Sequence, residues 1–428
     1  MTTICLKGGR IIDPSNERDE IGDLYYHGRK IISENKAKNT KYYDATGLII
    51  FPGLIDLRCH INNVNDGNCE NIYSVSKAAK AGGYTTVVLM PDLNPSPDNS
   101  ATIQFIKDQI NKDACINVEL TGCLTKSSDG KELAPIGSLK KAGVVALTDI
   151  PNSPQNNQIF YKAIEYASMF DIPVIDLPRD LSLSEKGNAH DGPEALKMGL
   201  GGFPRIAEEL HVQRAISISR SLKSSVHLSS ISSIGSVEMI RDAKKKGVSV
   251  TADVTPHHIS LTENNISDFN TNFKTSPPLR EEIDRLHLVK ALMDGTIDCV
   301  STAHQPITEH LKNVEYDLAP SGVIGLETSL NISLNILKQT KGFTWLNLIK
   351  IMSTRAAEIL NISGGTLKKG SHANIVLFDP LKKWKYTTKN GNSNGKNSPF
   401  DNMIFEGKVV ETIINGEPIL NYKNFISL

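Results

Sequence analysis

The sequence predicts an α/β protein: a TIM (β/α)8 barrel with a small β-sandwich domain made from both chain ends. Two observations lead to this prediction. Through the middle of the chain, eight short runs rich in β-branched residues alternate with helical stretches, which is typical of βα units and a parallel sheet. Both chain ends instead alternate apolar and polar residues with frequent turns, which favours short antiparallel strands. We expect residues 1–50 and 365–428 to form the small domain, and residues 51–364 to form the barrel.

The eight predicted barrel strands are, in order, LIIFPGLIDLRCH, YTTVVLMPD, INVELTGCLT, GVVALTDI, IPVIDL, SSVHLSS, VSVTADVTPHH and DCVSTAHQ. Helical patterns such as NIYSVSKAAKAGG and SVEMIRDAKKKG separate them, and several of these end in Gly near Lys, a common helix stop. The terminal strands are predicted in ICLKGGRIIDP, DLYYHGRKII and YYDATGLII, and in SHANIVLFDP, NMIFEGKVV and ETIINGEPIL. The Gly- and Asn-rich stretch KNGNSNGKNS is predicted to be an exposed loop.

The composition excludes several classes of function. Lys plus Arg and Asp plus Glu number 47 each, so the net charge is zero, which argues against a nucleic acid or an anionic membrane as partner. No apolar run reaches the ~18 residues of a membrane span, and the N-terminus does not resemble a secretory signal. The six cysteines are scattered without CxxC pairs. We therefore expect a reduced, cytoplasmic protein.

Polar or ionisable residues recur at the ends of nearly all eight predicted strands, where a barrel carries its chemistry. These residues are Arg58, His60, Asp92, Asp149, Asp176, His227, His257, His258 and His304. A single histidine at a strand end is more often structural than a ligand. The recurrence nevertheless indicates that a metal or acid–base site once lay there.

Arg58 and His60 lie two apart on a predicted strand and therefore face the same way. Two histidines at that spacing could share a metal, but a guanidinium has no lone pair to offer. One interpretation is that Arg58 forms a salt bridge with a neighbour. The interpretation we favour is that its cation occupies the space where a metal would sit.

The segment FPGLIDLRCH resembles the first-strand motif of cyclic amidohydrolases, in which Pro-Gly, Ile-Asp and a His-x-His pair follow one another. Further segments are similar, in the same order, to motifs of bacterial dihydroorotases of the multifunctional-complex type: MPDLNP, LTDI, LSEKG, HLSSISS, VTPHH, TSPPLR, TAHQPIT and APSGVIGLET. The resemblance runs from about residue 5 to about residue 420. It implies one or two zinc ions in the barrel mouth, an activated water that attacks a cyclic amide, and an Asp at strand eight that moves the proton.

Carried over residue by residue, the resemblance leaves three metal ligands: His60, Asp149 and His227. The first His of the pair is Arg58, and the strand-five His falls on Leu177, followed by Pro178 and Arg179. The strand-eight Asp is Ala303, so no catalytic residue is assigned. The substrate-pocket positions correspond to Arg58, Asn62, Asp92, Ser276 and His304, and a later substrate-contacting His is Ile307. We therefore expect weak or absent zinc and no cofactor, because even a catalytic single-zinc site needs three converging ligands.

Three hypotheses follow. The leading one is a catalytically inactive, dihydroorotase-like protein of pyrimidine biosynthesis, a homo-oligomer that acts as a structural partner of aspartate carbamoyltransferase. The second is an active metal-dependent hydrolase of a cyclic amide or imide, with a pocket rebuilt from Asp92, Asp176, Arg179, His190, His257, His258 and His304. Against it, His257 could belong to a structural turn beside Pro256, and His190 to a loop. The third is a regulatory subunit that binds an anion through Arg58.

Overall fold

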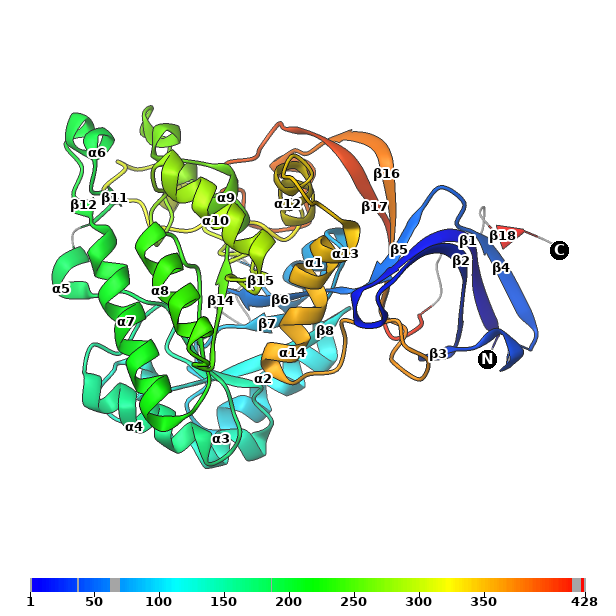
Figure 1. Cartoon of the computed structure of the whole chain (residues 1–428), viewed down its shortest axis with the longest axis horizontal. Helices are drawn as coiled ribbons and strands as arrows, with labels where there is room; N and C mark the ends of the chain where they lie inside the picture. The colour runs from blue at the N-terminus through cyan, green and yellow to red at the C-terminus, as the bar shows by residue number, and fades with distance from the viewer. Residues whose placement is uncertain (1, 37, 62–69, 186, 418–424, 427–428) are drawn as a thin grey trace.

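The computed structural model describes residues 2–36, 38–61, 70–185, 187–417 and 425–426. Eight parallel strands follow one another around a barrel in chain order (Figure 1). They are β6 (Leu54–Cys59), β7 (Tyr84–Leu89), β8 (Asn117–Cys123), β9 (Ala146–Thr148), β10 (Val174–Asp176), β13 (Val226–Leu228), β14 (Val250–Val254) and β15 (Cys299–Val300). The first and last strands meet where the His60 N–H donates to the His304 carbonyl at 2.8 Å. All eight lie in the eight predicted segments, so the predicted barrel is confirmed.

Helices cover the outside of the barrel. They are α1 (Ile72–Ala81), α2 (Ser100–Asp113), α3 (Ile136–Ala142), α4 (Asn157–Ser168), α5 (Leu181–Ser184), α6 (Pro193–Met198), α7 (Arg205–Leu222), α8 (Ile234–Lys245), α9 (Pro256–Ser260), α10 (Glu282–Asp294), α11 (Glu309–Lys312), α12 (Ser329–Leu337), α13 (Trp345–Ile349) and α14 (Arg355–Leu360). A π-helical segment, Lys350–Thr354, joins the last two. Polar residues begin several helices as the sequence signals suggest: the Asn71 side chain accepts from the Ser74 N–H at the start of α1, and Ser233 caps α8 in the same way.

Short elements complete the chain. A two-stranded parallel ribbon pairs β11 (Ala189–His190) with β12 (Gly202–Phe203). Single 3-10 turns lie at Pro14–Asn16, Glu34–Lys36, Lys126–Ser128, Glu263–Ile266, Thr271–Phe273 and Thr388–Asn390. Among the described residues, no helix combines the length and the apolar composition needed to cross a bilayer.

Both chain ends join in a second sheet, which confirms that they pair with each other. Its strands are β1 (Thr3–Asp13), β2 (Arg18–His27), β3 (Lys30–Ile32), β4 (Thr40–Asp44), β5 (Ile49–Pro52), β16 (Ile375–Lys385), β17 (Ile404–Ile413) and β18 (Phe425–Ile426). The C-terminal β16 lies antiparallel to the N-terminal β5. The sheet is mixed rather than purely antiparallel, because β1 runs parallel to both β4 and β5.

The segment LIIFPGLIDLRCH, predicted as one strand, is divided at Gly53 into β5 of the terminal sheet and β6 of the barrel. The chain can turn there only with glycine, because an added Cβ would lie 2.0 Å from Thr85 Oγ1. The strand of the terminal sheet thus continues through Pro52. The domain boundaries at 50/51 and 364/365 stay predictions.

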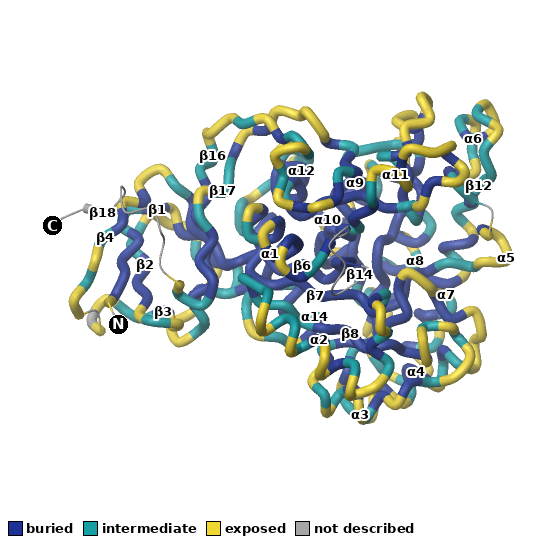
Figure 2. Tube along the Cα trace, turned by 180° about the vertical axis from the view of Figure 1, so that it is seen from behind, coloured by how far each residue is buried: buried dark blue, intermediate teal, exposed yellow. Residues whose placement is uncertain are grey.

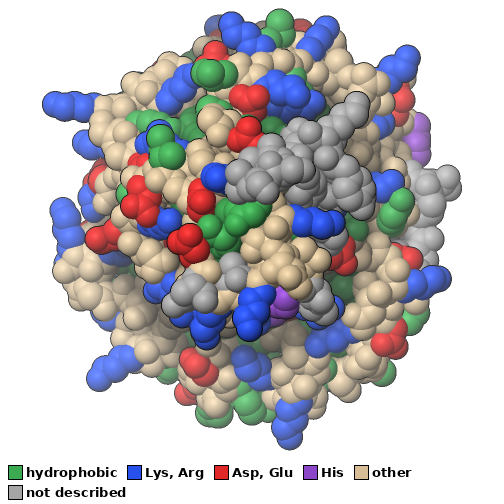
Figure 3. Space-filling view, turned by 90° about the vertical axis from the view of Figure 1, so that its right-hand side faces the viewer, with side chains coloured by type: hydrophobic (Ala, Val, Ile, Leu, Met, Phe, Trp, Pro, Cys, Tyr) green, Lys and Arg blue, Asp and Glu red, His purple; other side chains and the backbone are tan. Residues whose placement is uncertain are grey.

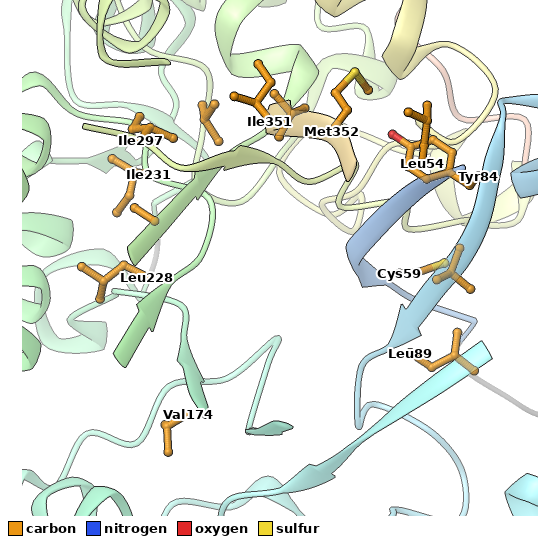
Figure 4. Packing of buried hydrophobic residues seen from close by; sticks show 14 of the residues in the cluster. Leu54, Cys59, Tyr84, Leu89, Val174, Leu228, Ile231, Ile297, Ile351 and Met352 are labelled. Carbon is orange, nitrogen blue, oxygen red and sulfur yellow. The ribbon is translucent and has the colours of Figure 1, made fainter. Parts of the chain in front are cut away.

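The largest apolar core lies between the barrel strands and their helices (Figure 2). Figure 4 shows side chains of this core on strands from opposite sides of the barrel, among them Cys59, Leu89 and Leu228, with Ile351 and Met352 from the π-helical segment. A separate apolar cluster fills the terminal sheet, around Leu6, Tyr26 and Leu377. These cores hold the strand ends in fixed positions, which is what places the candidate site.

Candidate functional site at the carboxyl end of the barrel

Arg58, at the end of β6, lies buried at the centre of the candidate site, with 3% of its surface exposed. Its Nε donates to His60 Nε2 at 3.1 Å, and its Nη1 donates to Ser230 Oγ at 2.8 Å. Burial lowers the pKa of Arg58, and the carboxylates of Asp253 and Asp92 oppose that shift. A guanidinium stays protonated even so. The structure therefore places a fixed cation between two strands that lie on different sides of the mouth.

Both ring nitrogens of His60 form hydrogen bonds within the protein. Its Nε2 accepts from Arg58, so the ring proton is assigned to Nδ1, which donates to Asp92 Oδ2 at 2.7 Å. Burial lowers the pKa of His60 despite the nearby Asp92 carboxylate. A neutral imidazole has one lone pair, and here it is used by Arg58. His60 therefore has nothing left to offer a metal in this arrangement.

Both ring nitrogens of His227, in β13, also form hydrogen bonds within the protein. Its Nε2 donates to Asp253 Oδ2 at 2.9 Å, and its Nδ1 pairs with Thr251 Oγ1 at 2.8 Å. The other oxygen of Asp253 accepts from the Ser230 N–H at 2.8 Å. A continuous series of hydrogen-bonded residues therefore crosses the mouth of the barrel. It runs from Asp92 through His60, Arg58, Ser230 and Asp253 to His227.

Asp149, the third residue that matches a family ligand, lies in a separate cluster. Its Oδ1 accepts from the N–H groups of Leu124 and Thr125, both at 2.9 Å, and its Oδ2 accepts from Thr125 Oγ1 at 2.6 Å. Burial raises the pKa of Asp149, and these hydrogen bonds oppose the shift. The carboxylate is thus engaged in holding the turn that follows β8.

The three side chains that match family ligands do not fit a zinc ion as they stand. Zinc needs three or four converging donors with free lone pairs. Protein donors occupy the imidazole lone pairs of His60 and His227, and the Asp149 carboxylate already accepts three hydrogen bonds. Within the described ranges, no three His, Cys, Asp or Glu side chains are grouped so that they could hold one metal ion.

The position of the family's catalytic Asp carries no acid or base. Ala303 follows β15 with a φ of 47°. This left-handed conformation is one that Asp and Asn adopt more readily than Ala. The backbone thus has a shape suited to a carboxylate side chain that this chain lacks.

Of the predicted substrate-pocket residues, Arg58, Asp92 and His304 lie around His60: the first two bond to its ring, and the His304 carbonyl accepts from its N–H. The second carboxylate oxygen of Asp92, Oδ1, is buried and has no hydrogen-bond partner among the described residues. Ser276 Oγ accepts from Arg179 at 3.3 Å. His304 Nδ1 accepts from the Gly325 N–H at 3.2 Å, and its Nε2 lies 3.7 Å from Glu70. Asn62 lies outside the described residues.

The residues of the alternative rebuilt pocket are bonded to several different parts of the chain. Asp176 accepts from Ser153, and Arg280 donates to both His190 Nδ1 and the Phe203 carbonyl. His190 is not a loop residue as first considered; it lies in β11 with 2% exposure. His258 pairs with Thr255 and with the Pro277 carbonyl. Among these residues, His257 and His258 stack on each other, with ring centroids 4.7 Å apart.

The stretch 389–398 is a loop, as predicted, but the expected exposure is wrong for four of its ten residues, 393, 395, 397 and 398, which are buried. Ser393 Oγ donates to the buried Glu70, and the Asn397 side chain donates to the carbonyls of Gln305 and Gly322, both at 2.9 Å. Ser393 and Asn397 are each 2% exposed. The polar composition that suggested a solvated loop is explained by these hydrogen bonds. The segment is thus bonded to Glu70, before α1, and to the connection that follows β15.

Sequence reasoning missed Ser230, Thr251, Asp253 and Glu70, the partners that complete this network. A signal existed for two of them. Thr251 and Asp253 alternate along the predicted seventh strand with Val250 and Ala252, so both point to the inside of the barrel. Nothing in the sequence marked Glu70 as a partner of residue 393.

Two buried lysines fix the segment that follows α11. Lys312 Nζ donates to the carbonyls of Thr271 and Pro320, both at 2.9 Å, and Lys274 Nζ donates to those of Tyr316 and Asp317. Burial lowers the pKa of Lys274 to about 8, and burial together with Lys274 lowers the pKa of Lys312 to about 7.

This lysine pair gives a testable pH dependence. Above about pH 7, the unfolded chain binds a proton at Lys312 that the folded chain has released, so the lysine makes stability rise with pH, up to its ordinary pKa of about 10.4. The unfolding free energy of the wild type minus that of Lys312→Met should therefore become more positive from about pH 7 to about pH 9, by at most about 1.4 kcal/mol per pH unit. Urea denaturation at several pH values measures it. Lys290→Met, at an exposed lysine, is the matched control for the loss of a lysine side chain. A difference for Lys312→Met that stays constant with pH would contradict the expectation.

Comparison with solved structures agrees with the architecture. Dihydropyrimidinase from Brevibacillus agri matches with a TM-score of 0.84 at 22% identity, covering 99% of this chain and 96% of that one. L-hydantoinase from Arthrobacter aurescens matches with a TM-score of 0.86 at 20% identity, covering 97% and 96%. At these identities the likeness is one of fold. The barrel with its terminal sheet is thus an amidohydrolase-type fold.

Sequence comparison gives the family. A family model described as dihydro-orotase-like matches residues 47–236. A protein named dihydroorotase from Endomicrobium trichonymphae is 40% identical over 412 residues, covering 96% of this chain and 98% of its own length. Another, from Syntrophus aciditrophicus, is 38% identical, with coverage of 96% and 98%. The chain belongs to the dihydroorotase family.

Proposed function

We propose that this chain is a non-catalytic member of its family, with a structural role in pyrimidine biosynthesis. The observation that carries the proposal is that the residues at the family's metal-ligand positions are hydrogen-bonded to other groups of the protein. Protein donors occupy the imidazole lone pairs of His60 and His227. The Asp149 carboxylate already accepts three hydrogen bonds from residues 124 and 125. The position of the proton-transferring Asp holds Ala303. A general acid–base group is worth about 10²–10⁴-fold in rate.

The experiment measures metal content and turnover together. Protein purified without added zinc is expected to hold far less than one metal ion per chain. It is also expected to show no dihydroorotase turnover in zinc-supplemented buffer. The Endomicrobium trichonymphae relative, prepared in parallel, is the positive control. One or two bound ions with turnover would overturn the proposal.

The name carried by the full-length relatives favours the second candidate, an active metal-dependent cyclic amidohydrolase. It requires His60 and His227 to exchange Arg58 and Thr251 for a metal. A screen of cyclic amides and imides with added divalent metal tests it. The third hypothesis, anion binding at Arg58, gains no support, because the carboxylates of Asp92 and Asp253 act on that cation.

We further propose aspartate carbamoyltransferase as the structural partner, which rests on the family resemblance and on the intact scaffold around the altered site. On the face shown in Figure 3, cationic and acidic side chains are interspersed, and the net charge is zero. Such a surface suits a protein partner better than a polyanion. Co-purification with the transferase from the same genome supports the proposal, and separate elution at micromolar concentration counts against it.

A further inference from the structure

Lys274 and Lys312 have buried side chains, with 3% and 6% of their surfaces exposed. Each amine donates two hydrogen bonds, and all four acceptors are backbone carbonyl oxygens. These oxygens carry no formal charge and so do not neutralise a cation. Lys244 shows the opposite arrangement, because its Nζ donates to the Asp298 carboxylate at 2.6 Å. Burial without a carboxylate favours the neutral form of a lysine.

The charge of Lys274 adds to the effect of burial at Lys312. Together they lower the pKa of Lys312 to about 7, with burial as the larger cause. Near neutral pH, a large share of the Lys312 side chains is therefore a neutral amine. Lysines that form Schiff bases with carbonyl compounds are activated by desolvation or by a neighbouring cation. Lys312 meets both conditions.

The hydrogen bonds of Lys312 leave its lone pair unused. A neutral amine has two N–H groups and one lone pair. The carbonyls of Thr271 and Pro320 accept from Nζ, both at 2.9 Å, which uses both N–H groups. The lone pair is the part of the amine that remains to react. A protonated imine at this nitrogen would keep one N–H for one of the two carbonyls.

Lys312 also lines an open cavity of about 630 Å³. This volume lies within the range of small-molecule sites, about 300–1,000 Å³. Ile307, in the connection that follows β15, lines the same cavity. The commonest residue in the lining is asparagine, with Asn270, Asn272, Asn313 and Asn397. Amide side chains both donate and accept hydrogen bonds, so they suit a ligand that carries hydroxyl groups.

The charges around the cavity favour an uncharged ligand. Apart from Lys312, the charged side chains in the lining are Lys389, Lys396, Glu309 and Asp401. Two cations thus face two carboxylates. With Lys312 neutral, the lining has no excess of either sign to select an ion.

We propose that Lys312 is a covalent binding site for a small, uncharged aldehyde or ketone that carries hydroxyl groups. The Nζ lone pair attacks the carbonyl carbon, and a C=N bond replaces the C=O bond. The carbonyl oxygen leaves as water with the two amine hydrogens, so no oxidant or reductant is needed. The ligand's hydroxyl groups bond to the asparagine side chains of the cavity. None of the family's metal-ligand positions takes part.

Limited labelling of the full chain with glycolaldehyde at about pH 7 tests this site. Sodium cyanoborohydride delivers hydride to the imine carbon and so traps the imine as a secondary amine, which peptide mapping by mass spectrometry locates. Lys312 is expected to react at least about 10-fold faster than the exposed Lys290, because fewer than about one in a thousand ordinary lysines are neutral at this pH. Labelling of exposed lysines with none at residue 312 would overturn the proposal.

The pH dependence separates an activated amine from one that is merely accessible. Lys312 is already neutral above about pH 8, whereas Lys290 continues to lose its proton up to about pH 10.4. The ratio of the two labelling rates should therefore fall by roughly tenfold per pH unit between about pH 8 and about pH 10. A ratio that does not change with pH would contradict the activation of Lys312.

The ligand class has its own test. Acetaldehyde has no hydroxyl group, so its preference for Lys312 over Lys290 should be severalfold weaker than that of glycolaldehyde. Asn313→Ala should weaken the glycolaldehyde preference, while Asn264→Ala, at an exposed position outside the cavity lining, should not. Equal preference for the two aldehydes would overturn the assignment of a hydroxylated ligand. All these measurements are made without metal or dihydroorotate, so they can fail while the non-catalytic assignment stands.

Discussion

Replacing Arg58 with methionine is expected to lower the free energy of unfolding by about 3–5 kcal/mol, the usual cost of removing one partner from a buried charge network. The guanidinium donates to His60 and Ser230, and it balances the carboxylates of Asp92 and Asp253. Without it, these acids remain buried with no cation between them. Urea denaturation followed by circular dichroism measures the change.

A double-mutant cycle separates this role from simple loss of packing. Asp253→Asn removes one carboxylate that the guanidinium balances, so Arg58→Met combined with Asp253→Asn should cost clearly less than the sum of the two single changes. Strict additivity would contradict a coupled network. Added zinc should not stabilise the wild type, because a ligand stabilises only the state it binds; a zinc-dependent rise in its melting temperature would contradict our account.

The second large effect is expected at Asp149, where alanine should cost about 3 kcal/mol or more. The carboxylate satisfies two buried N–H groups and the Thr125 hydroxyl, and each buried donor left without a partner costs about 1–3 kcal/mol. Asp149→Asn is the informative control. Its amide oxygen can still accept from both N–H groups, and only the acceptor for the Thr125 hydroxyl is lost, so the cost should be about 1–2 kcal/mol, less than that of alanine.

These two replacements distinguish a structural carboxylate from a metal ligand. A ligand would lose metal and activity with asparagine almost as fully as with alanine, because the amide oxygen is neutral and binds zinc poorly. A structural acceptor would tolerate asparagine and fail with alanine. Our assignment would be contradicted if both replacements destabilised the protein equally and if the wild type bound a metal ion that both variants lost.

The hydrogen bonds of Arg58 support our proposal that the mouth of this barrel needs no metal. A zinc ion in such a mouth attracts histidines and carboxylates from several strands to one point. Here one guanidinium links His60 on one side with Ser230 on the other. The segment that includes Ser393 and Asn397 is bonded to Glu70 and to the Gln305 carbonyl. Hydrogen bonds between residues of the chain therefore hold the barrel mouth in place.

The sequence by itself determined the eight barrel strands, the pairing of the chain ends and the family. Each depends on local pattern or on motif order, and periodicity along a strand or helix survives without knowledge of the fold. It also determined that Arg58 and Ala303 stand where a ligand and a carboxylate are expected, since residue identity limits which lone pairs and protons a position can offer.

Only the tertiary structure decided how the remaining site residues are used. The partner of Arg58 is Ser230, 172 residues away, and Ser393 reaches Glu70 across 323 residues. No local pattern reports such pairs, because a hydrogen bond depends on where the folded chain brings two groups. For the same reason part of a polar stretch predicted to lie in water, including Ser393 and Asn397, is buried in the folded chain.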